Sequence, residues 1–64
     1  MMLKELEQVL RGYGVAIIQW RDRHKQIKEI NTHIHLIKYC NDALLVREVL
    51  RVEIKGNDIE VFLK

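Results

Sequence analysis

Positions 50–63 show a regular alternation of side chains, with an apolar residue at nearly every second position, and this pattern limits the possible folds of the chain. Apolar side chains recur at every second position on both sides of Gly56-Asn57, a pair typical of a two-residue hairpin turn. Residues 50–55 and 59–63 are therefore predicted to form two strands. Their core-facing side chains would be Leu50, Val52, Ile54, Ile59, Val61 and Leu63.

Two registers are open for this hairpin. A turn at Gly56-Asn57, with glycine in the first position of a type II′ turn, pairs Lys55 with Asp58. It also sets Glu53 opposite Glu60, an unfavourable like-charge pair. A turn at Asn57-Asp58 exchanges that pair for Lys55 opposite Glu60. The pattern predicts the hairpin and leaves its register open.

The N-terminal segment is predicted to be a helix followed by a strand. Leu3, Leu6 and Leu10 recur at spacings of three and four, which places them on one face of a helix over residues 2–11. Gly12-Tyr13-Gly14 ends this helix, because glycine takes the left-handed conformation that closes helices. Residues 15–20 are β-branched and aromatic and predict a strand, with residues 21–24 as the polar loop after it.

Residues 27–49 allow two interpretations. As strands, residues 33–40 and 43–49 form a second hairpin around Asn41-Asp42. The rival is one long helix over residues 15–40, which needs many β-branched residues in a helix interior. The strand interpretation is preferred and gives one α+β domain over residues 1–64. In this domain an N-terminal helix is followed by a four-stranded antiparallel meander and packs on one face of the sheet.

The size of the chain limits how it can reinforce its core. A 64-residue domain buries only about 60% of its unfolded surface, and a single cysteine allows no internal disulfide. Self-association into a homo-oligomer is therefore expected. A single cysteine, Cys40, predicts a cytoplasmic protein. The charges within Met1–Glu5 argue against a secretory signal. No apolar run approaches the length of about 18 residues that a membrane span needs.

The basic excess of the chain is concentrated in residues 21–28. This stretch holds one acidic residue, Asp22, and four basic ones: Arg21, Arg23, Lys25 and Lys28. Together with Trp20 it is the best nucleic-acid candidate, since an exposed ring stacks on bases while cations neutralise phosphates. The competing interpretation, a core tryptophan before a solvated loop, is preferred because residues 15–18 are all apolar.

No catalytic residue, metal site or cofactor is predicted. The chain has no serine for a triad and no glycine-rich phosphate loop. His33 and His35 would share one face of a strand, but Cys40 has the opposite parity, and Glu48 is the nearest candidate for a third metal ligand. They are interpreted as half-exposed strand histidines, with His35 opposite Glu48. Cys40 has no adjacent cation to activate it and is predicted to be neither nucleophile nor metal ligand.

Two families resemble parts of this pattern. Residues 3–28, with a helix, Gly12-Tyr13-Gly14, a strand and a basic segment containing His24, resemble the start of small messenger-RNA-cleaving toxins. In that family a histidine after the first strands is catalytic, which implies this role for His24; the family's Gly-Ser-His context is absent. A helix before a short-strand meander is also similar to the Sm-like RNA-binding ring proteins, whose characteristic glycines and loops the chain lacks.

By elimination, the sequence predicts a small non-enzymatic interaction module, a regulator or accessory protein that self-associates and binds a protein partner. The alternative is a nucleic-acid-binding module that uses Trp20–Lys28. A ribonuclease with His24 as general acid or base comes third.

Overall fold

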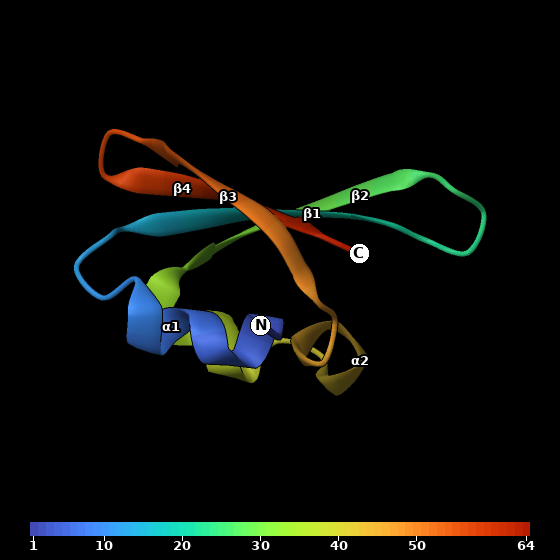
Figure 1. Cartoon of the computed structure of the whole chain (residues 1–64), viewed down its shortest axis with the longest axis horizontal. Coiled ribbons are helices and arrows are strands. Elements are labelled where there is room, and N and C mark those ends of the chain that lie inside the picture. The colour runs from blue at the N-terminus through green and yellow to red at the C-terminus, as the bar shows by residue number, and fades with distance from the viewer.

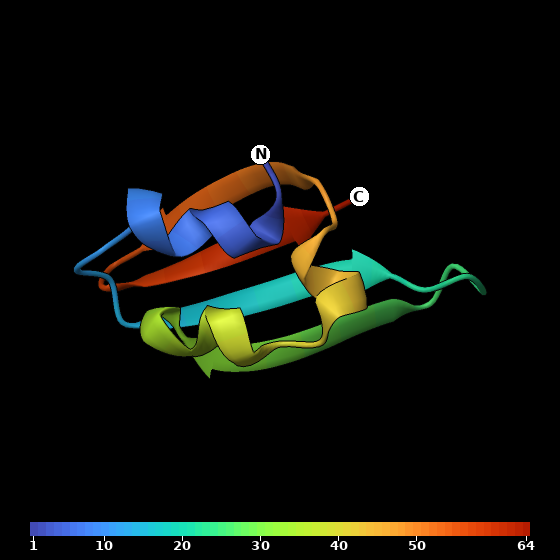
Figure 2. The same cartoon turned by 90° about the horizontal axis from the view of Figure 1, so that it is seen from below.

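The computed structural model describes all 64 residues and has two layers, a four-stranded sheet and a set of short helices on one of its faces (Figure 1, Figure 2). The α+β class is confirmed. None of the helices has the length and hydrophobicity of a membrane-spanning segment. In chain order, with η for a 3-10 helix, the elements are η1 (Leu3–Glu5), α1 (Leu6–Val9), β1 (Val15–Arg21), β2 (Ile27–His33), η2 (Ile34–Tyr39), α2 (Asp42–Leu45), β3 (Val49–Lys55) and β4 (Asp58–Leu63).

The sheet is mixed, so the predicted antiparallel meander is wrong. Its strand order is β2-β1-β4-β3, and the central strands β1 and β4 run parallel. Each central strand forms an antiparallel hairpin with an outer neighbour, β1 with β2 and β4 with β3. Parallel strands need a long connection, and here it includes η2 and α2, which pack beneath the sheet. The two strands with the most regularly buried side chains thereby take the centre.

The core lies between the central strands and the helices. Its fully or nearly fully buried side chains are Leu3, Leu6, Ala16, Ile18, Ile34, Ile37, Leu44, Leu45, Ile59, Val61 and Leu63. The outer strands β2 and β3 contribute no buried residue. Two predicted core residues are therefore misplaced, since Leu50 is 61% and Ile54 58% exposed. A register shift between Val49 and Arg51 takes Leu50 out of the regular alternation.

The C-terminal hairpin has the first of the two predicted registers. Lys55 pairs with Asp58, and Glu53 lies opposite Glu60. Gly56 has a φ of 65°, and Asn57 has no positive φ, as a type II′ turn requires. The like-charge pair is offset by cations on either side. Lys55 Nζ lies 3.0 Å from Glu60 Oε1, and Arg51 Nε lies 3.8 Å from Glu53 Oε1.

The predicted strands 33–40 and 43–49 are wrong, because most of these residues are helical. Ile34 and Ile37 are both fully buried, and their spacing of three residues matches the period of a 3-10 helix. Asn41 is the N-cap of α2, where its Oδ1 accepts a hydrogen bond from the Ala43 N–H at 2.7 Å. The same residue type favours turns and N-caps, so Asn41-Asp42 suited both interpretations.

The first hairpin uses a strand that the sequence did not predict. Residues 27–33 form β2, although most of their side chains are polar and the two apolar ones, Ile27 and Ile30, do not alternate with them regularly. The rival long helix over residues 15–40 is therefore also wrong. Asp22 holds the turn between β1 and β2, since its Oδ1 accepts hydrogen bonds from the N–H groups of His24 at 2.8 Å and Gln26 at 3.0 Å. The N-terminal helix is present but shorter than predicted, as η1 and the single turn of α1.

Candidate functional site

The sheet face turned away from the helices, the open face, is mainly polar. It carries every second side chain of each strand, including Gln19, Glu29 and Glu60, and Gln19 Nε2 donates to Glu29 Oε1 at 3.1 Å. Most of the apolar residues in positions 34–45 belong to η2 and α2 rather than to the sheet. The open face has no helical cover (Figure 1).

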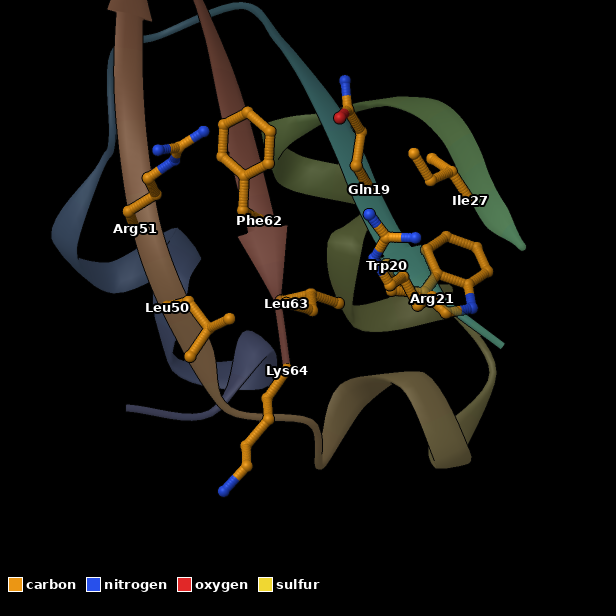
Figure 3. Close-up of a pocket in the computed structure, with 9 residues that line it drawn as sticks. All are labelled: Gln19, Trp20, Arg21, Ile27, Leu50, Arg51, Phe62, Leu63 and Lys64. Carbon is orange, nitrogen blue, oxygen red and sulfur yellow. The ribbon is translucent and has the colours of Figure 1, made fainter. Parts of the chain in front are cut away.

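One end of the open face is hollowed into a groove of about 600 Å³ (Figure 3). We call it the cationic groove. It is lined by Gln19, Trp20, Arg21, Ile27, Leu50, Arg51, Phe62, Leu63 and Lys64. Three of these side chains are cations and none is a carboxylate. The groove is therefore a positively charged surface with an apolar floor.

The parallel pairing of β1 and β4 creates this site. Because the carboxyl ends of parallel strands lie at the same end of a sheet, Arg21 at the end of β1 and Lys64 just after β4 come together. The Arg47 guanidinium fastens this end, since its Nη1 donates to the Arg21 carbonyl at 3.3 Å and to the Lys64 carbonyl at 2.9 Å. The outer strands begin at this same end, so Ile27 of β2 and Leu50 and Arg51 of β3 also line the groove.

Two exposed apolar side chains border the groove. Ile27 lies opposite Arg21 at the start of β2 and is 64% exposed. Leu50 reaches the groove because the irregularity at the start of β3 removes it from the core-facing series. Exposed aliphatic side chains beside cations suit a ligand that is apolar as well as anionic.

The groove's arginines are held in place by local contacts. The Arg51 guanidinium lies over the Phe62 ring, 4.2 Å from its centroid. Arg21 Nη1 donates to the Lys25 carbonyl at 3.0 Å. These contacts restrict the two side chains on the open face.

The predicted basic segment does not form one surface. Trp20 is half-buried, packs against the core and is among the residues that line the groove, while Arg21 lies in the groove beside it. Lys28 pairs with Trp20 across the hairpin and lies 4.0 Å from Asp22 Oδ2. Arg23 and Lys25 lie in the turn beyond the strands.

Sequence reasoning missed Arg51, Phe62 and Lys64 as site residues. The available signal was the alternation itself, which places Arg51 and Phe62 on the side of the hairpin opposite the core residues. Their proximity to Arg21 depends on the parallel pairing, which no local pattern in the sequence indicates.

The histidines occupy other parts of the molecule. His24 is exposed in the turn between β1 and β2. The His33 and His35 rings stack with centroids 5.0 Å apart, and His35 Nδ1 lies 4.0 Å from Glu7 Oε1. The predicted pairing of His35 with Glu48 is wrong, because His35 belongs to η2 rather than to a strand. No group of three or more His, Cys, Asp or Glu side chains is placed to hold a metal ion.

Cys40 caps the end of η2 and borders a second hollow of about 340 Å³ on the helix side of the sheet. Burial raises the pKa of the Cys40 thiol above its ordinary value. Desolvation is the cause of this rise, and no neighbouring cation lowers the pKa to activate the thiol. Neither hollow is lined by a histidine or a carboxylate, so neither brings together groups for acid-base chemistry.

Comparison with protein-family models, with curated proteins and with solved structures finds no match to this chain.

Proposed function

We propose that this protein is a non-enzymatic interaction module that self-associates and binds an acidic, partly apolar segment of a protein partner in the cationic groove. The observation that carries the proposal is the composition of the groove, in which three cations, Arg21, Arg51 and Lys64, adjoin exposed Ile27 and Leu50. Glu53, whose Oε1 lies 3.8 Å from Arg51 Nε, does not line the groove. Arginine pairs with carboxylates in two-point geometry. The aliphatic side chains bury apolar surface of the same partner segment.

A nucleic-acid strand in the same groove is the second candidate. Two aromatic residues beside three cations favour it, since single strands bind through stacking and phosphate contacts. Two features favour the peptide. Arg51 already covers one face of Phe62, and Trp20 is packed against the core, so neither ring offers an unobstructed stacking platform. The aliphatic border also has no use in binding phosphates.

The ribonuclease candidate has the least support. His24 lies in a solvent-exposed turn and lines neither hollow, and neither hollow contains a histidine or a carboxylate for acid-base catalysis.

Trp20, the single tryptophan of the chain, lines the groove, so its fluorescence reports binding there directly. The test titrates the protein with a synthetic peptide of glutamate and leucine, a lysine and leucine peptide, and a mixed-sequence single-stranded oligonucleotide. The acidic peptide is expected to bind, with an affinity that falls as salt is added.

The matched variants are R21E/R51E in the groove and R23E/K25E in the hairpin turn, which change the net charge equally. R21E/R51E should weaken peptide binding about tenfold or more, because two charge-assisted contacts become repulsive. R23E/K25E should leave it nearly unchanged. Binding that prefers the oligonucleotide, or that depends on the turn pair, would overturn the proposal.

A further inference from the structure

The two edges of the sheet differ in how they are protected. At the β3 edge, the N-terminal residues run alongside the start of the strand: the Val49 N–H donates to the Met1 carbonyl at 2.7 Å, and Met2 bridges to Glu48. The register shift near Leu50 disturbs the same edge. Short cover and irregular pairing are two ways in which proteins block strand addition.

The β2 edge has neither protection. β2 pairs with β1 over all seven of its residues without a register shift. The chain contains no proline to interrupt it. Figure 2 shows no element beyond β2 on the outer side of the sheet. An open, regular edge of this length is a template for another strand.

The hydrogen-bond pattern shows which groups of β2 are free. Asp22 N–H donates to the Gln26 carbonyl in the turn, and antiparallel pairs alternate from that point. Lys28, Ile30 and Thr32 therefore bond to β1, whereas Glu29 and Asn31 direct their backbone N–H and C=O groups away from it. No turn or cap hydrogen bond satisfies these outward groups.

We infer that two copies of this chain pair through β2, antiparallel about a two-fold axis at Ile30, so that the two sheets join into one. This inference rests on the self-association proposed above and names its surface. Ile30 is the middle residue of Ile27–His33, so this register pairs the whole strand with its copy. It keeps each side chain on its own face of the joined sheet.

The charges of β2 suit this register and disfavour the two neighbouring two-fold registers toward the start of the strand. With the axis at Ile30, Glu29 lies opposite Asn31 of the second copy and Lys28 lies opposite Thr32. An axis at Lys28 or at Glu29 would place like charges directly opposite each other, which is unfavourable. At the axis, the two Ile30 side chains meet in a close, non-hydrogen-bonded pair.

Cysteine cross-linking tests the axis. In a C40A background, I30C should form an intermolecular disulfide under mild oxidation, because the paired Cα atoms would lie about 4.5 Å apart. K28C is the matched control on the same face. Its two copies would lie about 13 Å apart, beyond disulfide reach, since they are offset by four residues.

Charge variants at Asn31 test the register in solution. N31E sets two pairs of glutamates opposite each other and should raise the dimer Kd about fivefold, whereas N31K should lower it by a similar factor. The double variant E29K/N31E restores opposite charges and should restore dimerisation. Sedimentation measures each Kd, and thermal melts of diluted samples check that each monomer is folded.

Two negative outcomes have different meanings. A wild-type chain that stays monomeric at every concentration overturns both the inference and the self-association on which it rests. A dimer that ignores the charges at Asn31 and forms no I30C disulfide overturns the β2 pairing alone and leaves self-association standing.

Discussion

The hairpins β1–β2 and β3–β4 are built alike, with one strand at the centre of the sheet and one at its edge. The central strands bury alternate side chains, whereas neither outer strand has a buried residue. In the sequence, however, β3 alternates as regularly as β4, while β2 is largely polar. Alternation therefore reports which face of a strand is apolar and does not report how deeply that strand lies.

Val52 and Val61 form a matched pair for this comparison, because they face each other across β3 and β4. V61D would place a carboxylate at a fully buried position and should prevent folding, since the cost of several kcal/mol exceeds the stability that the core of a 64-residue domain can supply. V52D should remain folded, because half-buried Val52 lets the carboxylate reach water. Far-UV circular dichroism and amide NMR dispersion would show the difference. Two equally unfolded variants would mean that β3 is as central as β4.

The turns of the two hairpins differ in what stabilises them, and D22A measures that difference. It removes the acceptor of two backbone hydrogen bonds and should cost about 1–2 kcal/mol. D22N should retain most of the stability, because both bonds use the same oxygen, Oδ1.

In the turn between β3 and β4, the Cβ that G56A adds meets no neighbouring atom, so this variant should cost about 1 kcal/mol from the positive φ alone. Denaturant melts check all three, and a D22N loss equal to that of D22A would contradict the Oδ1 explanation.

The smallest expected effect concerns Cys40, which lies in the connection between the two hairpins. Because the thiolate is the reactive form and burial raises the pKa of Cys40, the folded thiol stays protonated to higher pH than a free thiol. Its alkylation by iodoacetamide at about pH 8 should be slower than in the denatured chain, and this gap should narrow as pH rises past the folded-state pKa. Equal rates in both states would show that Cys40 is freely exposed. C40A should leave peptide binding unchanged.

The C-terminal hairpin was predictable because a turn pair and an apolar series on each side specify it locally, whereas its register, left open by the sequence, is that of the Gly56-Asn57 turn. β2 was not, because its side chains are mostly polar and its strand conformation depends on pairing with β1. Residues 34–45 misled for another reason. The strand prediction rested on alternating apolar residues, and the spacing of three between Ile34 and Ile37, which indicates a 3-10 helix, is not an alternation. Asn41 suits an N-cap as well as a turn.

The site was partly visible in the sequence. Trp20 and Arg21 were selected from the basic segment, and both line the groove. Arg23, Lys25 and Lys28 do not, because a turn and the opposite face of the hairpin carry them away from it. Arg51 and Lys64 join Arg21 only through the order of strands in the sheet, which is a property of the tertiary structure.

The parallel contact between β1 and β4 also sets the order in which this molecule can form. It joins Ala16 to Ile59 and Ile18 to Val61, so the central pairing must close most of the chain into a loop. Such distant contacts slow folding. During synthesis the first hairpin emerges well before its central neighbour, with one side of β1 unpaired and its apolar residues uncovered. Until β4 has left the ribosome, that strand is the point at which a growing chain is most open to aggregation or to protection by a chaperone.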